Sequence, residues 1–464
     1  MSLTCFKAYD IRGRLGVDLD AGIAYRIGRG FARALGAKTV VLGRDCRASS
    51  AELAQAVQQA LMAEGVHVLD LGLCGTEEMY FATAHFSADG GICVTASHNP
   101  MDWNGMKMVR AGAAPLDAAT GLARIKSLAE ADNFGSAQSG THQDIAEDAR
   151  KAYVARVLSF VDVAALAPLK ILVNAGNGAA GPTFDAIAAE LAAQGAALSF
   201  VRMHHTPDGS FPNGIPNPLL PENQPETANA VTAAGADFGV AWDGDFDRCF
   251  FFDHGGSFIP GEYVVGLLAE VFLAKHPGAK IIHDPRVIWN TLDVVTQSGG
   301  QAVQSRTGHA FIKQAMRDVD AVYGGEMSAH HYFRDFAYCD SGMIPWLLIA
   351  ELVSRKGPLR DLVASRRAAF PSSGEINFTL NDPVAAIARV RAEYEPLAVA
   401  MDDMDGLGFD LGTWRFNLRS SNTEPVVRLN VETRGDPDLL AQEVDRLRAV
   451  LTSKPSQTML KAPL

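Results

Sequence analysis

The chain has 464 residues, too many for one ordinary hydrophobic core, and at roughly 100 to 150 residues per domain we expect three or four domains. With 48% hydrophobic and 20% charged residues, the composition excludes a disordered or fibrous chain and is typical of a soluble globular enzyme. A formal net charge of −12 argues against a nucleic-acid or anionic-membrane partner, because both require a broad basic face.

Membrane insertion, export and cysteine chemistry are also disfavoured. The longest apolar stretch, residues 343–350, is far shorter than the roughly 20 residues that span a bilayer. The amino-terminal residues MSLTCFKAYD lack the apolar region of a signal peptide. The six cysteines form no CxxC pair, which predicts neither a zinc site nor a disulfide framework. We therefore expect a cytoplasmic protein with reduced thiols.

The first part of the chain alternates between strand and helix patterns. Strand patterns that begin at Thr39, at Val66 and at Gly90 are separated by helical patterns. This alternation predicts a mostly parallel sheet in an α/β domain. A Gly/Ser/Gln-rich stretch at residues 133–143 predicts a linker that closes this first domain.

Ser97 lies in the motif TASHNP, directly after the strand pattern of residues 90–95. Ligands of open α/β sheets bind at the carboxyl ends of the strands. We interpret Ser97 as a phosphate carrier; the alternative is a solvated turn without chemistry. Lys107, on the next strand pattern, is expected to face the same loop.

The second unit contains a glycine motif that resembles a dinucleotide site. Gly176, Gly178 and Gly181 follow a strand pattern and fit GxGxxG. The next strand pattern, residues 198–203, ends without the acidic residue that holds a ribose. The glycines are therefore interpreted as permitting close packing of helix and sheet, with a nicotinamide or flavin site as the alternative.

Three aspartates alternate in the motif DGDFDR, after an apolar strand pattern. An extended backbone would point Asp243, Asp245 and Asp247 to one side. An EF-hand is excluded, because Arg248 and His254 occupy the positions that need Gly and Glu. The pattern favours a magnesium site, with an acidic surface turn as the alternative.

The third unit, from Gly261, ends in a polar loop. The sequence GGEMSAHHYF places Glu326, Ser328 and His330 together, after the strand pattern of residues 321–323. These side chains offer hydrogen-bond donors and acceptors without an obvious nucleophile, as sugar hydroxyls require. A polar loop without a ligand is the alternative.

The pattern changes to an α+β one near residue 369. Between the last two strand patterns, the sequence LRSSNTEP supplies a guanidinium, hydroxyls and an amide. Such a set can hold a phosphate, and a turn ended by Pro425 is the alternative. The proposed phosphate ligands are Arg419, Ser421, Asn422 and Thr423.

Together the motifs FKAYDIRG, TASHNP, DGDFDR, GEMSAH and RSSNTEP resemble, in order and spacing, those of the α-D-phosphohexomutase family. The resemblance covers the whole chain. It implies three similar mixed-sheet α/β domains and a smaller α+β carboxyl-terminal domain around a central cleft. We expect these domains at residues 1–146, 147–254, 255–368 and 369–464, carrying the phosphoserine, metal, sugar and phosphate loops respectively.

The resemblance also implies a role for each motif. Ser97 would be the phosphoserine, with Arg248 as a partner of the transferring phosphate. Glu326 and Ser328 would bind the 3- and 4-hydroxyls of the sugar. The other implied roles are Mg²⁺ binding by Asp243, Asp245 and Asp247 with Ser97, proton transfer by Lys107 and His309, lining of the cleft by Tyr9, Arg12, Arg286 and His330, and binding of the second phosphate by Arg419, Ser421, Asn422 and Thr423.

Two positions depart from the sequence motifs that are common in the family. Phe246 and Ala329 stand where the family often has glycine, which adopts positive φ at little cost. Met327 is more typical of the mannose and glucose mutases than of the glucosamine mutases.

We therefore expect interconversion of mannose 6-phosphate and mannose 1-phosphate through a phosphoserine and a hexose 1,6-bisphosphate, supplying GDP-mannose for surface polysaccharide. The implied cofactors are Mg²⁺ and, as activator, glucose 1,6-bisphosphate or mannose 1,6-bisphosphate. The alternatives are a phosphoglucomutase or dual-specificity mutase, a Mg²⁺-dependent sugar phosphatase and a non-catalytic sugar-phosphate sensor. A monomer and a homodimer are both compatible with the sequence.

Overall fold

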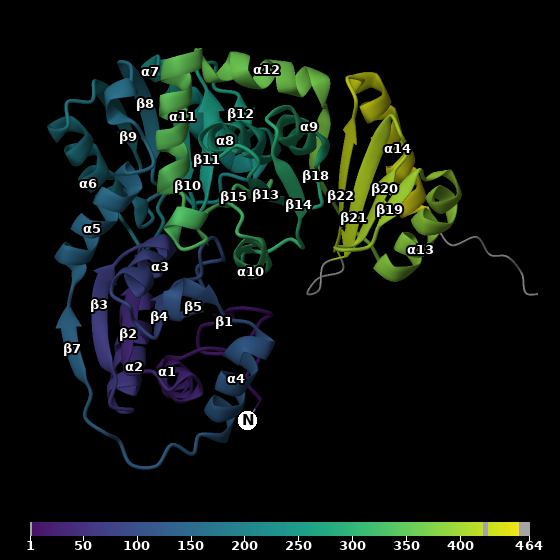
Figure 1. The fold of residues 1–464 in the computed structure, drawn as a ribbon. Helices are drawn as coiled ribbons and strands as arrows, with labels where there is room; N and C mark the ends of the chain where they lie inside the picture. The colour runs from purple at the N-terminus through teal and green to yellow at the C-terminus, as the bar shows by residue number, and fades with distance from the viewer. Residues whose placement is uncertain (1, 421–425, 454–464) are drawn as a thin grey trace, which may run out of the picture.

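The computed structural model describes residues 2–420 and 426–453, and these form four sheets that follow one another in an arc in chain order (Figure 1). The first three sheets combine parallel and antiparallel strands with helices, and the fourth is antiparallel. Three α/β domains and one α+β domain are thus present, as the sequence predicts. No described helix has both the length and the apolar character needed to cross a membrane.

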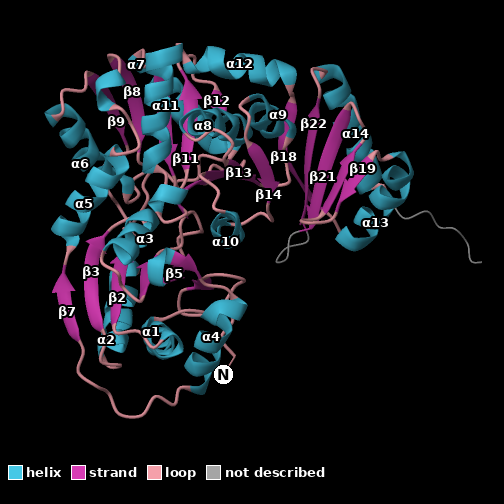
Figure 2. Ribbon diagram, viewed as in Figure 1, coloured by secondary structure: helices cyan, strands magenta, loops and turns pink. Residues whose placement is uncertain are grey.

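The first sheet has helices on both faces (Figure 2). Val40 and Leu42 pack into the apolar core on one face, and Val41 packs on the other face, as the two-residue period of a strand requires. The strands, in sheet order, are β1 (Ile11–Arg14), β5 (Trp103–Arg110), β4 (Gly90–Val94), β2 (Thr39–Arg44), β3 (His67–Leu73) and β7 (Thr141–Asp144), with β6 (Ala114–Pro115) beside β5; the helices are α1 (Ala21–Leu35), α2 (Ser50–Met62), α3 (Thr76–His85) and α4 (Ala123–Ala131).

The linker prediction for residues 133–143 is wrong at its end. Residues 141–144 form β7, which pairs in parallel with β3. All four residues are exposed, because β7 is an edge strand whose backbone pairs on one side only. An edge strand of this kind requires no apolar side chains, so its sequence resembles that of a linker.

The second and third domains repeat the mixed arrangement. In the second, the strand order is β12 (Phe258–Ile259), β11 (Cys249–Asp253), β10 (Phe238–Trp242), β8 (Leu169–Asn174) and β9 (Leu198–Met203), with α5 (Ala146–Leu158), α6 (Ala180–Ala193) and α7 (Gln224–Ala234). In the third, the order is β14 (Gln301–Gln304), β13 (Lys280–His283), β15 (Tyr323–Gly325), β16 (His331–Phe333) and β17 (Cys339–Asp340), with α8 (Gly261–Lys275), α9 (Trp289–Gln297), α10 (His309–Val319), α11 (Met343–Lys356) and α12 (Leu359–Ala369).

The fourth domain is smaller, and both of its long helices pack on one face of its sheet (Figure 2). The strand order is β18 (Ser372–Thr379), β22 (Val426–Thr433), β21 (Trp414–Ser420), β20 (Leu407–Asp410) and β19 (Ala400–Asp402), and the helices are α13 (Pro383–Tyr394) and α14 (Pro437–Thr452).

The same hairpin recurs in the first three domains. In each, the last parallel strand is followed by a loop and an antiparallel partner, namely β4 and β5, β10 and β11, and β15 and β16. Residues 95–102, 243–248 and 326–330 are these three connections. Three of the sequence motifs therefore occupy equivalent places in three similar domains.

The glycines of the GxGxxG motif permit close packing, although against carbonyl groups of neighbouring loops and not, as predicted, of helix against sheet. A Cβ atom at Gly178 would lie 2.8 Å from the carbonyl oxygen of Gly244, and one at Gly181 would lie 1.9 Å from that of His205. The backbone N–H of Ala179 donates to the Gly244 carbonyl at 3.0 Å. The motif thus supports the loop of residues 243–248.

A buried carboxylate joins the first and third domains. Glu77 of α3 accepts hydrogen bonds from the Ser341 hydroxyl at 2.9 Å and from the N–H groups of Gly342 and Met343, at the start of α11. It also accepts from the hydroxyl of Tyr153 in α5. A helix amino terminus attracts negative charge, so this carboxylate caps α11 from another domain.

Replacing Glu77 with Ala removes the acceptor of these four buried donors. Each donor left without a partner costs roughly 1–3 kcal/mol. We therefore expect the Glu77→Ala variant to unfold at a clearly lower temperature than the wild type in differential scanning calorimetry. The matched control is Glu190→Ala, at an exposed position of α6, and an equally small shift in both variants would contradict the prediction.

Candidate active site

The loops of residues 95–100 and 243–248 meet at Ser97. The Ser97 hydroxyl donates to Asp243 Oδ2 at 2.7 Å and lies 3.0 Å from His98 Nδ1. The residue is 2% exposed and has a φ of +51°, and its N–H donates to Thr95 Oγ1 at 2.9 Å. The side chain is thus aimed from the first domain at the acidic loop of the second.

The three aspartates converge through a turn and not through an extended strand. Residues 244 and 245 form the turn, and Phe246 has a φ of +45°. Asp243, Asp245 and Asp247 are at most 1% exposed, and one oxygen of each lies within 4.8 Å of the others. The prediction that these carboxylates lie together is confirmed, but the extended backbone expected for them is wrong.

Phe246 keeps its positive φ because its side chain is fixed. The ring is fully buried at the start of α3, where a Cβ atom at Gly75 would lie 2.3 Å from it. Thr76, the next residue, donates its hydroxyl to Asp245 at 2.6 Å. Ala329 also has positive φ, at +70°. Phe246 and Ala329 therefore both adopt the positive φ that is typical of glycine, although neither is a glycine.

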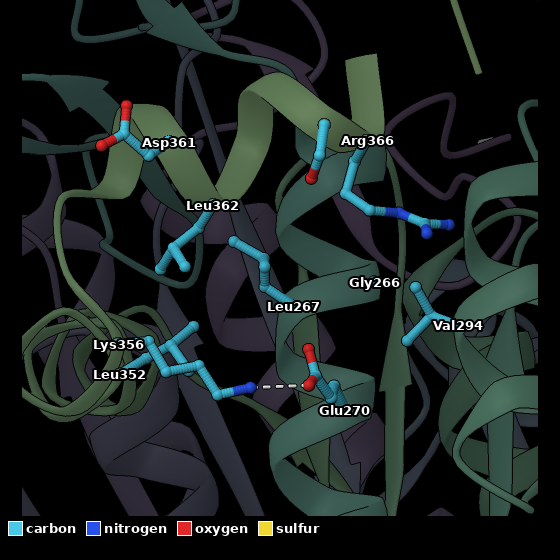
Figure 3. A pocket seen from close by; sticks show the side chains of 10 residues that line it. Gly266, Leu267, Glu270, Val294, Leu352, Lys356, Asp361, Leu362 and Arg366 are labelled. Carbon is cyan, nitrogen blue, oxygen red and sulfur yellow. Dashed lines mark hydrogen bonds and ion pairs between the residues drawn. The ribbon is translucent and has the colours of Figure 1, made fainter. Parts of the chain in front are cut away.

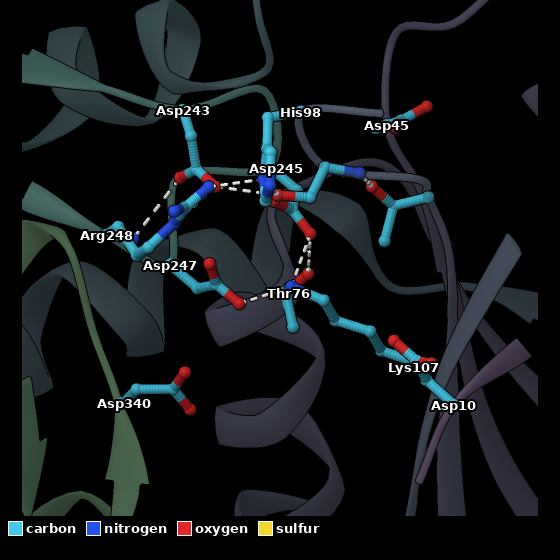
Figure 4. Close-up of polar contacts among 12 residues, drawn as sticks. Asp10, Asp45, Thr76, His98, Lys107, Asp243, Asp245, Asp247, Arg248 and Asp340 are labelled. Atoms are coloured by element: carbon cyan, nitrogen blue, oxygen red, sulfur yellow. Dashed lines mark hydrogen bonds and ion pairs between the residues drawn. The ribbon is translucent and has the colours of Figure 1, made fainter. Parts of the chain in front are cut away.

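Positive charge comes to the aspartates from two domains (Figure 4). Lys107 Nζ, on β5, lies 2.8 Å from Asp245 Oδ2 and contacts Asp247. Arg248 donates to Asp243 Oδ2 through Nε at 3.0 Å and Nη2 at 2.7 Å. Burial raises the pKa of Asp247 to about 6. At Asp245 burial also acts to raise the pKa, but the charge of Lys107 and the hydrogen bonds from Lys107 and Thr76 together hold the pKa below its ordinary value.

This cluster could hold a metal ion. Asp245 Oδ1 and Asp247 Oδ1 are buried and have no hydrogen-bond partner among the described residues. Buried, unpaired carboxylate oxygens are ligands of hard divalent cations. The residues present therefore fit a metal site, as the sequence predicts.

Asp340 and Lys313 belong to the same cluster but were not predicted. Asp340 is fully buried, accepts from His330 Nδ1 at 2.9 Å and lies 2.7 Å from Lys313 Nζ. Polar atoms of Asp247, His330 and Asp340 lie within 4.8 Å of one another. His330 therefore connects the third domain to the aspartates, and the lone Asp340 in the stretch YCDSG gave no sequence signal.

Tyr9 and His309 lie together where the first domain faces α10. Their rings meet edge to face with centroids 4.6 Å apart. Both ring nitrogens of His309 are buried without a hydrogen-bond partner in the described chain. Burial and the charge of Lys313 hold the pKa of His309 well below its usual value, so the ring is neutral.

Glu326 is fixed at both oxygens. Its Oε1 accepts from the N–H of Gly308 at 2.9 Å, and its Oε2 accepts from the Tyr332 hydroxyl at 2.6 Å. Arg286 Nη2 lies 3.7 Å from Glu326 Oε1 and donates to the Ser328 hydroxyl at 3.2 Å. The three predicted residues Arg286, Glu326 and Ser328 are thus brought together.

Arg419 joins this group from the fourth domain. It donates to Asp405 at 3.1 Å and to Glu375 Oε2 at 3.3 Å, and Arg286 lies 3.7 Å from the same Glu375 oxygen. Arg428 Nε lies 3.9 Å from the other Glu375 oxygen, so three guanidinium groups from two domains face one carboxylate, which the sequence did not single out. The remaining predicted phosphate ligands, Ser421, Asn422 and Thr423, lie outside the described residues.

Arg12 holds the other side of the serine loop. It donates to Asp10 at 2.9 Å and to Asn99 Oδ1 at 2.9 Å. Contacts connect the members of this site. Arg12 binds Asn99 of the serine loop, Ser97 binds Asp243, and Asp247 lies beside His330. The backbone of Glu326 binds that of His330, and Arg286 lies beside both Glu326 and Glu375, which Arg419 also contacts. The described predicted residues therefore form one continuous site.

A separate cavity of about 230 Å³ contains none of these residues (Figure 3). It lies between α8, α11 and α12, has apolar walls such as Leu267 and Leu362, and includes an ion pair of Lys356 and Glu270 at 2.6 Å. Of its charged lining groups, Lys356 pairs with Glu270 and Arg366 with Asp293, and it lacks the grouped carboxylates of the acidic cluster.

Comparison with known proteins identifies the family. The chain matches the four models described as phosphoglucomutase/phosphomannomutase domains I, II, III and C-terminal, at residues 4–135, 151–256, 260–370 and 375–450.

Individual relatives agree with these matches. A phosphomannomutase of Salmonella montevideo is 60% identical, over 97% of this chain and 100% of its own length. A phosphomannomutase of Escherichia coli (strain K12) is 59% identical, over 97% of this chain and 98% of its own. The solved structure of a phosphoglucomutase/phosphomannomutase family protein from Burkholderia thailandensis is 34% identical, with a TM-score of 0.86 over 97% of each chain. The chain therefore belongs to the phosphoglucomutase/phosphomannomutase family.

Proposed function

We propose that this protein interconverts mannose 6-phosphate and mannose 1-phosphate through a phosphorylated Ser97 and a hexose 1,6-bisphosphate intermediate. The observation that carries the proposal is the hydrogen bond of 2.7 Å from the buried Ser97 hydroxyl to Asp243. A serine so placed, beside an acidic cluster and the guanidinium of Arg248, suits phosphoryl transfer. The relatives named phosphomannomutase support the choice of substrate.

The transfer is balanced between two oxygens. The bond between phosphorus and Ser97 Oγ breaks as the free hydroxyl oxygen of the sugar phosphate binds phosphorus. The hydroxyl proton passes to a base, and the released Ser97 oxygen takes up a proton from an acid. The intermediate then turns over, and its other phosphoryl group returns to Ser97. Most of the catalysis in such transfers is positioning and electrostatic stabilisation.

Charge explains the composition of the site. A phosphoserine carries about −1.5 to −2 charges, next to three aspartates and an anionic substrate. Asp243, Asp245 and Asp247 would hold Mg²⁺ together with an oxygen on Ser97. When bound, the ion would supply positive charge to the transferring group. Arg248 supplies further positive charge from the protein itself.

The sugar and its second phosphate would be held by the third and fourth domains. Glu326 and Ser328 are assigned to the 3- and 4-hydroxyls, and the second phosphate to Arg419 with Ser421, Asn422 and Thr423. Tyr9, Arg12, Arg286 and His330 would line the cleft. Because the 3- and 4-hydroxyls lie in the middle of the ring, contacts with them can form in both orientations of the bisphosphate.

His309 and Lys107 are the proposed proton-transfer groups. A neutral imidazole with both nitrogens unpaired can accept a hydroxyl proton. Lys107 contacts two aspartates, which stabilise its charged form; it is therefore suited to neutralising negative charge, and it would donate a proton only where those contacts are lost.

Glucose and mannose phosphates differ at the 2-hydroxyl, which the assigned contacts do not use. A dual-specificity phosphomannomutase and phosphoglucomutase is therefore the second candidate, and the family models carry both names. We place the enzyme in the cytoplasm as a monomer or homodimer that supplies mannose 1-phosphate for GDP-mannose, with glucose or mannose 1,6-bisphosphate as activator.

Removal of metal tests the role of the aspartates. Excess chelator should abolish the conversion of mannose 6-phosphate, and added Mg²⁺ should restore it. Asp245→Asn should be inactive with Mg²⁺ present, whereas Asp185→Asn, at an exposed position on α6, should retain activity. Undiminished turnover in excess chelator would contradict the assignment of these aspartates as metal ligands.

Glu326→Gln tests the assignment of the sugar hydroxyls. The amide keeps the shape of the side chain but loses the acceptor strength of a carboxylate, and hydrogen bonds to charged groups are worth about 1.5–3 kcal/mol. We expect kcat/KM to fall by roughly 10- to 100-fold with mannose and glucose phosphates alike. A fall in kcat/KM confined to one hexose phosphate would mean that Glu326 also contacts the 2-hydroxyl.

Ser97→Ala tests the phosphoenzyme. The variant should fold, since only one hydroxyl is lost, yet stay inactive even with glucose 1,6-bisphosphate. Dephosphorylated wild type should show a lag that this activator shortens. Mass spectrometry should find phosphate on the wild-type peptide of residues 95–100, and Ser199→Ala, at an exposed position on β9, should behave as wild type. An active Ser97→Ala variant would overturn the proposal.

A further inference from the structure

The carbonyl groups of the serine loop converge on one buried side chain, Arg47, which lies between β2 and α2. Its Nη2 donates to the carbonyl oxygens of Ser97 at 2.9 Å and Asn99 at 2.6 Å. Its Nη1 donates to those of Pro100 at 3.0 Å and Trp103 at 3.2 Å. One guanidinium group thus binds the loop at its beginning, middle and end.

From this geometry we propose that Arg47 is the positioning residue that fixes Ser97 for phosphoryl transfer. Among the described residues, Arg47 contacts neither the Ser97 hydroxyl nor the aspartates of residues 243–247. It therefore acts through the backbone of the serine loop. The proposal rests on the function proposed above and adds a residue to it.

The loop needs such a support, because its conformation is strained. Ser97 has a positive φ, which costs on the order of 1–3 kcal/mol for a residue other than glycine and persists only where the surroundings enforce it. Four carbonyl dipoles that point to one place also repel one another. A guanidinium group offsets the repulsion of the carbonyl dipoles, since it is always charged, and holds the strained backbone in place, since its donors form a rigid fork.

Arg47 is itself held in place by Asp45 and by Phe211. Its own N–H donates to Asp45 Oδ1 at 2.9 Å, and the Asp45 carboxylate lies 3.6 Å from its Nε. The hydroxyl of Ser50 donates to the same Asp45 oxygen at 2.5 Å. From the second domain, the ring of Phe211 covers the guanidinium at 5.4 Å. Arg47 is therefore 3% exposed and has little freedom to move.

The carbonyl of Ser97 is enclosed between two domains. Arg47 donates to it from one side, and on the other side a Cβ atom at Gly244, in the aspartate loop, would lie only 2.6 Å away. Fixing this carbonyl fixes the backbone from which the Ser97 hydroxyl reaches Asp243. Because Asp45 balances the charge of Arg47, the effect is geometric more than electrostatic.

Arg47→Lys is the sharpest test. Lysine keeps the charge but offers one compact donor group in place of the fork, so it cannot reach four carbonyls. We expect kcat to fall by about 100-fold, the scale of a displacement near 1 Å, while KM for mannose 6-phosphate stays close to wild type. The sugar contacts, in the third and fourth domains, are untouched by the substitution.

Arg29→Lys is the matched control. Arg29 is also a buried arginine of the first domain, bound to Glu64 and to the carbonyl of Phe134, but it lies outside the site. We expect this variant to lose thermal stability and keep its kcat. A kcat for Arg47→Lys as high as that for Arg29→Lys would overturn the role of Arg47.

Chemical rescue separates positioning from folding. Millimolar guanidinium chloride should restore part of the kcat of Arg47→Ala, and urea at the same concentration should not. Restoration by neither, with Arg47→Ala folded, would contradict the proposal.

Hydrogen–deuterium exchange does not depend on activity. Peptides that cover residues 97–103 should exchange faster in Arg47→Lys than in Arg29→Lys, and equal exchange would contradict the proposal. A wild type without isomerase activity would refute the proposed function alone, and exchange would still decide the role of Arg47.

Discussion

Three buried carboxylates must share one small space in this protein, and that constraint organises the structure around them. Buried charges are costly unless they are paired. The pairing groups come from different domains: Lys107 from the first, Arg248 from the second, and His330, held by Asp340, from the third. The site exists only when these domains pack together. The cap that Glu77 places on α11 is therefore a requirement of the site as much as of the fold.

Repetition of one hairpin explains how the domains achieve this convergence. The serine loop, the aspartate loop and the Glu326 loop each follow the last parallel strand of a similar sheet. Each domain therefore needs only one functional loop at one place. Direct packing sets the loops against one another, as where Phe246 fills the space beside Gly75. The fourth domain, built differently, adds Arg419 to Arg286 through their shared contact with Glu375.

The sequence predicts the features that depend on local patterns. The strand before Ser97 and the loop placement of the aspartates follow from apolar runs ended by turn residues. The extended aspartate backbone is a wrong prediction, because the positive φ of Phe246 depends on burial of its ring at a distant helix. Arg47, Asp340, Lys313 and Glu375 were not assigned to the site from the sequence, because each lies in an unremarkable stretch and acquires its meaning from contacts that form only in the folded chain.

The proposed turning of the intermediate imposes a further requirement on Glu326, which we assign to the sugar hydroxyls, and the surroundings of Glu326 meet that requirement. A carboxylate that relied on the sugar to orient it would have to adjust each time the other end of the ring was presented. Here Gly308 fixes one oxygen and Tyr332 the other, and both donors belong to the third domain, as Glu326 does. The protein therefore sets the orientation of the carboxylate without a ligand, and this orientation is the same for both ways in which the sugar ring is presented. Each oxygen also retains capacity for another donor, since a carboxylate accepts about four hydrogen bonds.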